Sequence, residues 1–449
     1  MSRQIVKSSG YVIGRPGPGE VAMWGLAIAV GAVVGLLVWL FGILASYLQF
    51  LAYGAAAGRL ASRAADLAWW SLLIGPLAGG ALTALLLRAG VSTGRGLRPP
   101  PYGLQHVLMN RRLRNTIQSS TLSLKDSFLS AAIGLVSSGW GGSTGREEPL
   151  AHLGASIGIL HGRLLGLDIA ARRLLLAMGF AAAIAASLHT PLAAVLLTAE
   201  IILRRGQHST LGPIVVAAVS GWLASGWLSG GRPLLDLPDA GYIPAGAHVL
   251  ALFCLPLLIM SGYAAHWVWA RTPRLVDAAA NRLNIPLWTM PSIGGLLLGL
   301  QAVATPHVLG AGFDQITAAA TGSVGADVML TLAVAKLVAA ATLLCFRWGG
   351  GAIAPAMVIG AMAGASLALT AGAISGMSTP PVYLSVIGMS VCLAIILDAP
   401  LAAGVMAMEL SGSPEIGAAS CLACFAAYVV VQRLPPVVSV RTDTVLRGR

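Results

Sequence analysis

The chain has 449 residues, of which 57% are hydrophobic and only 10% are charged, and its mean hydropathy is +0.81. So few charged side chains cannot cover the surface of a soluble globular protein of this length, which excludes that class. Glycine is abundant (55 residues) while aromatic residues make up only 6%. This composition favours closely packed transmembrane helices over a lipid-facing β-barrel, so we expect an all-α polytopic membrane protein.

The net charge is +12, from 28 basic and 16 acidic residues. The basic residues lie in short segments between apolar stretches, where they act as topology determinants, so we expect a lipid bilayer and no nucleic acid as partner. Both ends of the chain are basic. We therefore expect a multi-pass protein of a bacterial inner membrane with both termini in the cytoplasm.

The cysteines and histidines indicate neither a disulfide framework nor a metal site, and no cofactor is expected. The five cysteines all lie in apolar runs, and Cys421 and Cys424 have only the spacing of a redox or metal pair. No second such pair accompanies them, so buried packing is the preferred interpretation. The eight histidines show no spacing typical of metal ligands.

In chain order, residues 1–19 form a cytoplasmic or interfacial lead-in without an apolar span, and a basic half-helix is expected at 103–110 after the proline-rich segment 94–102. Several predicted helices are shorter than the roughly 20 residues that cross a bilayer, and broken helices at membrane depth line a cavity or are buried in protein. We therefore predict a pathway at the centre. The predicted helical stretches are 19–50, 69–87, 121–142, 149–165, 173–188, 191–203, 211–229, 247–270, 286–304, a short one from 312, 324–346, 355–373, 381–398, 400–411 and 414–431.

The segment Gly145-Arg146-Glu147-Glu148-Pro149 places two acids in apolar surroundings just before a helical stretch. A carboxylate inside a membrane is costly and is usually functional. The backbone N–H groups at a helix start attract anions, so an ionised glutamate there would itself occupy an anion site. The alternative interpretation is a helix-capping acid at the membrane surface.

The two halves of the chain repeat each other. Pro191-Leu-Ala-Ala with Glu200 recurs as Pro400-Leu-Ala-Ala with Glu409, an offset of 209 residues (400 − 191). The pattern of Pro149, Gly154 and Gly158 recurs at an offset of 206 residues (355 − 149). Matching pieces in the same order predict a duplication, with a substrate site between the repeats near the middle of the membrane. The expected organisation is a first repeat at 20–230, a connection at 231–244, a second repeat at 245–435 and a basic cytoplasmic tail at 436–449 without a regulatory domain.

These residues resemble the CLC family of chloride channels and chloride/proton antiporters. Residues 145–149 are similar to the family motif G-[KR]-E-G-P, and Gly351-Ala352-Ile353-Ala354-Pro355 is similar to G-x-F-x-P. Tyr102-Gly103-Leu104-Gln105 lies where the family has G-S-G-I-P. The resemblance extends over nearly the whole chain and implies an inverted repeat of many tilted and broken helices, a homodimer, and one anion pathway per subunit.

The resemblance also implies the site residues. Glu147 corresponds to the gating glutamate, which competes with the anion when charged and moves away when protonated. Glu148 replaces a family glycine, and we expect it to face water or Arg146, with a second gate as the alternative. The anion-binding positions implied by the resemblance are Tyr102, Gly103, Gly145, Arg146, Glu147, Ala352 and Ile353.

The sequence departs from the family pattern at three positions. The serine that helps bind the central anion falls at Tyr102, and the tyrosine of the last family helix falls at Pro435. One hypothesis is that the Tyr102 hydroxyl replaces the hydroxyl of that missing tyrosine. The alternative is that Tyr102 is an anchor at the membrane interface. The inner proton-transfer glutamate falls at Ile201, which carries no proton. Adjacent Glu200 points about 100° away on a helix, so Glu200 and Glu409 are interpreted as structural acids at helix ends, with Glu200 only a weak candidate for the proton pathway.

The expected function is chloride or other small-anion transport gated by Glu147, either passive or weakly proton-coupled. The alternative is a tightly coupled chloride/proton antiporter, in which water or Glu200 replaces the missing acid. Fluoride specificity is disfavoured, because the motifs do not resemble that branch. A membrane-embedded enzyme using Glu147 or His152 is a remote alternative, because no nucleophile–base pair or metal-ligand spacing is present.

Overall fold

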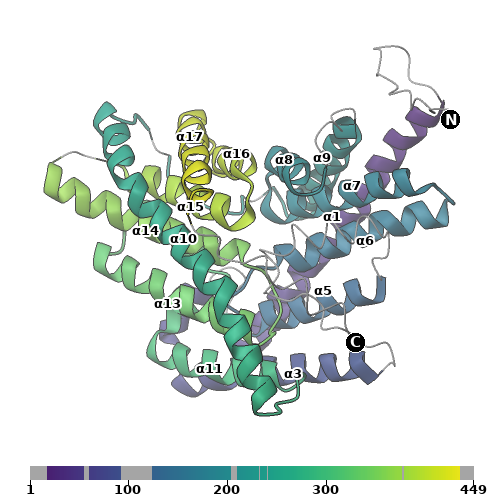
Figure 1. Ribbon diagram of the computed structural model, residues 1–449, viewed down its shortest axis with the longest axis horizontal. Helices are drawn as coiled ribbons and strands as arrows, with labels where there is room; N and C mark the ends of the chain where they lie inside the picture. Colours follow the sequence, from purple (N-terminus) through teal and green to yellow (C-terminus); the bar gives the residue numbers. More distant parts are fainter. Residues whose placement is uncertain are drawn as a thin grey trace, which may run out of the picture.

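The computed structural model describes residues 18–54, 60–92, 124–203, 210–231, 233–239, 241–376 and 379–434. Within these ranges the regular secondary structure is helical, apart from one isolated β-bridge. The helices of the first half are α1 (Pro18–Tyr53), α2 (Leu60–Arg63), the 3₁₀ turn η1 (Ala64–Asp66), α3 (Trp69–Ser92), α5 (Leu124–Gly139), α6 (Glu147–Leu164), α7 (Ile169–Leu188), α8 (Pro191–Ile201) and α9 (Leu211–Leu228) (Figure 1).

The second half is likewise a run of long and short helices. Its elements are α10 (Ala245–Arg282), α11 (Met290–Ala304), the 3₁₀ turn η3 (Pro306–Val308), α12 (Phe313–Thr321), α13 (Ala326–Cys345), α14 (Ile353–Ser375), α15 (Pro381–Leu397), α16 (Pro400–Ser411) and α17 (Pro414–Val431). Among the described residues, eight helices are long and apolar enough to cross a membrane, whereas α8, α11, α15 and α16 are shorter apolar helices. The prediction of a polytopic protein built partly from short helices is confirmed.

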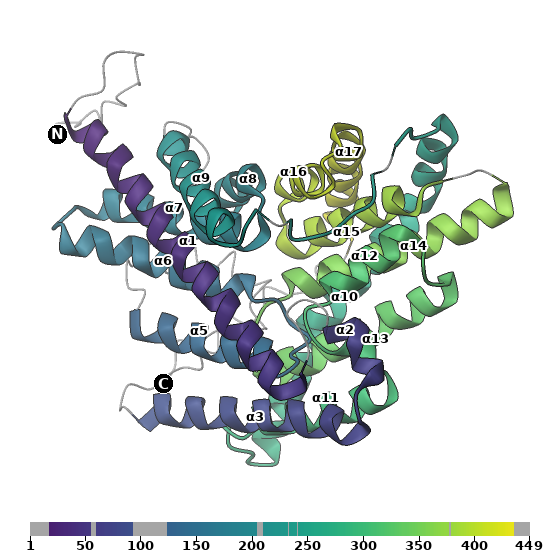
Figure 2. The same ribbon diagram turned by 180° about the vertical axis from the view of Figure 1, so that it is seen from behind.

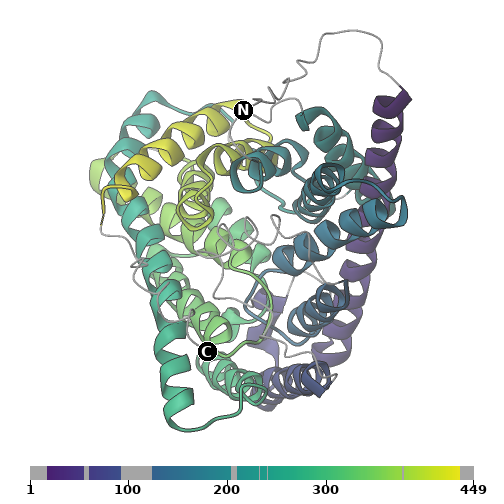
Figure 3. The same ribbon diagram turned by 45° about the vertical axis from the view of Figure 1, so that its right-hand side comes forward.

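Corresponding helices of the two halves occupy corresponding places in the molecule. The long helix α10 crosses the face seen in Figure 1, and its counterpart α1 crosses the opposite face seen in Figure 2. Turning the molecule by 45° shows these two helices on its two flanks (Figure 3). Helices α3 and α11 pack together at one end, and α8 and α16 pack together at the other. The fold is therefore the inverted repeat predicted from the sequence.

Glycines allow the helices of each half to approach closely. The α6–α7 pair meets where Gly154 lies against Gly179, and the α14–α15 pair meets where Gly360 lies against Gly388. A Cβ atom at any of these positions would collide with backbone of the partner helix. Such contacts stabilise helix pairs inside a membrane, where no hydrophobic effect drives helices together. These two pairs form much of the buried core around the centre of the molecule.

Helix α10 is longer than the predicted stretch 247–270, because it continues to Arg282 through Pro273. Its last turns carry Asp277, whose carboxylate accepts a hydrogen bond from Arg347 Nη2 at 2.8 Å. This ion pair ties the extension to the loop before α14. A proline inside a helix removes one hydrogen bond, which neighbouring elements of a membrane protein compensate.

Candidate functional site

Two loops, one from each repeat, meet in the interior of the molecule. Gly145 N donates to Gly351 O at 2.8 Å, and Gly351 N donates to Gly145 O at 2.7 Å, which forms an isolated antiparallel bridge. Each bridge glycine lies just before a helix, because α6 begins at Glu147 and α14 begins at Ile353. The bridge therefore fixes two helix starts from opposite repeats side by side. Such starts carry partial positive charge and N–H groups that no helical carbonyl accepts.

The loop before α14 needs glycine to make this approach. Gly350 has φ +92, and a Cβ atom there would collide with the Thr144 hydroxyl. That hydroxyl donates to Gly349 O at 3.0 Å, which adds a third link between the loops beside the bridge. A side chain at Gly350 would therefore disturb both its own turn and the contact with the other repeat.

Glu147 is fully buried, with 0% of its surface exposed. Neither carboxylate oxygen has a hydrogen-bond partner of good geometry among the described residues. The carboxyl group folds back over Gly145, because a Cβ atom added to Gly145 would collide with the Oε2 atom of Glu147. The same added Cβ atom would lie 3.1 Å from Ala354 N in α14. The carboxylate thus lies between the two helix starts. Its burial excludes the alternative of a capping acid at the membrane surface.

We expected Glu148 to face water or Arg146, and this expectation is corrected. Its Oε1 atom accepts a hydrogen bond from Ala352 N at 2.8 Å, so the side chain reaches across to the other repeat. Its carboxyl end packs directly against Gly351, where an added Cβ would collide with it. No local sequence pattern indicates this contact, because the partner is 204 positions away along the chain.

These bonds change the list of amides that were expected to bind an anion. The N–H of Gly145 is committed to the bridge and the N–H of Ala352 is bonded to Glu148. Of the five backbone positions expected at the two helix starts, Arg146, Glu147 and Ile353 remain as candidates. Ile353 is 2% exposed, so an anion there would have lost most of its water. Tyr102 and Gly103 lie outside the described residues, as does Pro435.

The side chain of Arg146 lies close to this site. Its Nη1 atom points toward Gly42 of α1, and its Nε atom is buried without a hydrogen-bond partner among the described residues. The guanidinium interacts electrostatically with Glu147 and with His189. A buried cation beside the helix starts favours negative charge there.

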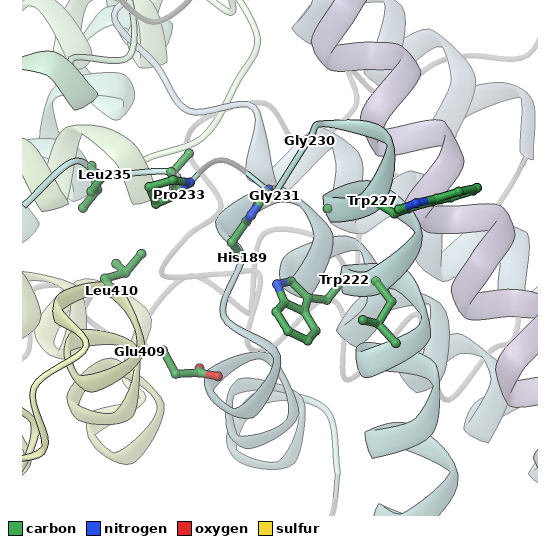
Figure 4. A pocket seen from close by; sticks show the side chains of 12 residues that line it. His189, Trp222, Trp227, Gly230, Gly231, Pro233, Leu235, Glu409 and Leu410 are labelled. Atoms are coloured by element: carbon green, nitrogen blue, oxygen red, sulfur yellow. The ribbon is translucent and has the colours of Figure 1, made fainter.

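A cavity of about 560 Å³ opens beside His189. In Figure 4, His189 and Trp222 line one side of the cavity, and Glu409 and Leu410 of α16 line the other. His189 ends α7 in the left-handed conformation (φ 59), and its counterpart Asp398 ends α15 in the same way (φ 55). The cavity therefore reaches from the contact between the repeats to a residue that interacts with Arg146.

The two acids predicted to be structural form reciprocal contacts between α8 and α16. Glu200 accepts hydrogen bonds from Leu401 N at 3.2 Å and Ala402 N at 2.9 Å. Glu409 accepts hydrogen bonds from Leu192 N at 2.9 Å and Ala193 N at 2.8 Å. Each carboxylate near the end of one helix thus caps the start of the other, as twofold-related residues would. Ile201 is 6% exposed and packs in the core.

Lys336 is a buried charged residue outside the set of sequence-predicted site residues. It lies in α13 with 1% of its surface exposed, and its Nζ atom donates to Val308 O at 3.3 Å and to Gly310 O. Asp314 interacts with it electrostatically. The sequence does indicate such a residue, because a lone lysine in the apolar run 326–345 is energetically costly and requires polar partners. Lys336 holds the loop that leads into α12.

A family model described as "Voltage gated chloride channel" matches residues 102–432, about three quarters of the chain. The chain belongs to this family, the CLC proteins. Members are channels or transporters that carry anions, so the chain is an integral, multi-pass membrane protein of an anion-transporting family. The resemblance stated from the motifs is confirmed.

Curated relatives of the chain carry both kinds of name. It is 29% identical to a putative chloride channel protein ClcB-like of Ralstonia nicotianae, over 85% of this chain and 87% of that protein. It is 26% identical to the voltage-gated ClC-type chloride channel ClcB of Salmonella typhimurium, over 91% of this chain and 95% of that protein. It is 27% identical to the H(+)/Cl(-) exchange transporter ClcA of Klebsiella pneumoniae, over 67% of this chain and 65% of that protein.

Solved CLC structures share the fold. A slow cyanobacterial Cl-/H+ antiporter matches with a TM-score of 0.76 at 20% identity, covering 91% of this chain and 94% of that one. A CLC-type fluoride/proton antiporter matches with a TM-score of 0.72 at 22% identity, covering 93% of this chain and 97% of that one. At these identities the likeness establishes the architecture and not the transported ion.

Proposed function

We propose that this CLC protein carries chloride and other small anions through one pathway per subunit, with Glu147 as a protonatable gate. The observation that carries the proposal is the fully buried Glu147 carboxyl group at two facing helix starts, without a hydrogen-bond partner of good geometry among the described residues. A buried carboxylate without a hydrogen-bond partner is energetically costly. A permeating anion would bind the same backbone N–H groups at the helix starts. The two therefore compete for one place.

Helix starts suit this task because they hold an anion without a full positive charge. Backbone N–H groups replace lost hydration water, while their partial charges bind the ion weakly enough to release it. Protonation of Glu147 removes its charge, so the side chain leaves and the anion enters. The cavity beside His189 supports an access route toward Arg146.

We propose passive or weakly proton-coupled transport. Ile201 occupies the position of the inner proton-transfer glutamate in the family, and an isoleucine does not relay protons. The adjacent Glu200 accepts two backbone hydrogen bonds at the start of α16, which favours a structural role. Tight chloride/proton exchange is the second candidate, supported by the H(+)/Cl(-) exchange transporter ClcA among the curated relatives.

Anion flux in liposomes separates these two functions. The purified protein is reconstituted and assayed with chloride, nitrate and fluoride, with and without a pH gradient. We expect chloride and nitrate flux with a reversal potential at or close to the anion equilibrium value, at most slightly displaced by the pH gradient. A displacement to the value set by stoichiometric chloride/proton exchange would establish tight coupling, and the absence of any anion flux would overturn the proposal.

The remaining features are proposed from the resemblance and the charge distribution. The protein is a homodimer in a bacterial inner membrane, and its basic termini lie in the cytoplasm. The two repeats occupy residues 20–230 and 245–435, joined by 231–244. This organisation is supported by the matched helices of the two halves.

A further inference from the structure

Both glycines of the bridge are covered by carboxylates, and both carboxylates come from α6. Glu147 lies over Gly145, and Glu148 lies over Gly351. The counterparts of these acids in the second repeat, 206 residues later, are Ile353 and Ala354, and the first turn of α14 contains no acid. One repeat therefore supplies negative charge to the starts of both helices.

Glu148 makes a specific contact at the start of α14. Its Oε1 atom lies 2.8 Å from Ala352 N, and the carboxyl end of its side chain is seated on the bare backbone of Gly351. A side chain at position 351 would block this seat. Ala352 is 1% exposed, so the bond forms in a place largely shielded from water. A carboxylate–amide hydrogen bond at a helix start is a strong one.

The contacted amide is one that an anion is expected to use. Ala352 N–H belongs to the pair of α14 amides implied in anion binding, and its neighbour Ile353 supplies the other. A bound anion and the Glu148 carboxylate cannot both accept the same N–H at full strength. The second carboxylate also adds negative charge next to the place where the ion must sit.

We propose that Glu148 is a second tethered carboxylate, which occupies the α14 half of the anion site and weakens anion binding there. This inference rests on the proposed function. Glu147 competes for the α6 half and Glu148 for the Ala352 amide, so an anion that fills the site must displace both. Glu148 thereby sets the affinity of the site, whereas Glu147 gates it.

The test is chloride binding to the full-length purified protein, measured by calorimetry in detergent. Glu148→Gly restores the glycine of the family motif and frees the Ala352 amide, and we expect roughly tenfold tighter chloride binding. Glu148→Gln keeps the size of the side chain but removes its charge, so we expect a smaller gain. The matched control is Asp168→Asn, which alters a carboxylate beyond the other end of α6 that caps α7 by accepting a hydrogen bond from Ala171 N at 2.8 Å.

The outcomes are distinguishable. Unchanged chloride affinity in both Glu148 variants, with tighter binding in Glu147→Gln, would overturn this inference and leave the proposed function intact. A wild-type protein that neither binds chloride nor carries anions in liposomes would overturn both. A gain that appears equally in Asp168→Asn would assign the effect to a general change in charge, which also overturns it. Thermal unfolding of each variant shows whether it is folded, and Glu148→Gln retains the packing if Glu148→Gly does not fold.

Discussion

Glu147 combines complete burial with a position between two helix starts. Desolvation penalises its charged form, while the partial positive charge of the helix starts and the nearby Arg146 favour it. The opposing effects make the charge state sensitive to small changes around the site, such as the arrival of an anion. This balance is what a gate needs, because a carboxylate held too firmly would block the pathway at every pH.

Glu147→Gln tests the gate directly. In the wild type, lowering the pH protonates the carboxyl group and frees the site, so anion flux rises as pH falls. Glutamine is neutral at every pH, so we expect the variant to carry flux at pH 7 on the order of tenfold above wild type, with little pH dependence. Liposome flux between pH 4.5 and 8, in roughly half-unit steps, measures this.

The control for this measurement is Glu415→Gln, which removes a half-exposed carboxylate that pairs with His248 at 3.1 Å, away from the bridge. It should keep the pH profile of the wild type. A Glu147→Gln variant that retains the full pH dependence would assign the gate to another titrating group.

The sequence predicted Glu147 because the motif around it places an acid at a helix start in an apolar run. It did not predict the contact of Glu148, since that bond depends on how a loop from the other repeat folds back. The amides of Gly145 and Ala352 illustrate the same limit. Sequence spacing identifies which N–H groups lie at a helix start, but only the folded chain shows which of them are already bonded.

At the scale of helices, α8 and α16 are joined by two reciprocal caps. The short lengths of these helices, 11 and 12 residues, leave a large share of their backbone groups at the ends. Glu409 and Glu200 satisfy two N–H groups each at those ends. The caps therefore stabilise the contact between the repeats as well as each helix.

We expect Glu409→Gln to lower the free energy of unfolding by about 1–2 kcal/mol, because a neutral amide replaces a charged acceptor of two hydrogen bonds. The repeat relationship predicts a similar loss for Glu200→Gln. Reversible unfolding in mixed micelles measures both. If Glu200→Gln changes proton transport but leaves stability unaltered, Glu200 serves as a proton relay rather than as a cap.

The helices themselves were predicted well from the sequence, because apolar runs bounded by glycine, proline and basic residues mark their ends. α10 departs most from the predicted stretch 247–270, since it continues through Pro273 to Arg282. The polar turns beyond it are held by the Asp277–Arg347 pair, which joins residues 70 positions apart. No local pattern reports such a contact.

For the whole molecule, the offset between the halves was the strongest sequence signal, and the structure gives it physical form. The antiparallel bridge joins equivalent glycines of the two repeats, and the two caps are equivalent contacts made once in each direction. The low share of charged residues likewise agrees with the eight long apolar helices among the described residues. The number of subunits does not follow from these features, because the contacts between subunits lie outside a single chain.

We expect the purified protein to be a homodimer. Exposed apolar side chains on α16 and α17 are candidates for the contact, namely Leu422 (75% exposed), Phe425 (59%) and Leu401 (53%). Light scattering in detergent should give twice the mass of one chain. Leu422→Arg would place a charge on this surface and shift the mass toward the monomer. A monomeric wild type at all concentrations would contradict the expectation.

The unequal placement of the acids on a duplicated scaffold gives the pathway a direction. In a site assembled from two identical halves, ions arriving from either side of the bilayer would meet the same charges and side chains. Here one half carries both glutamates, whereas the first turn of α14 in the other half contains no acid. Ions entering from opposite compartments would therefore meet different surroundings, and we expect unequal anion flux in the two directions.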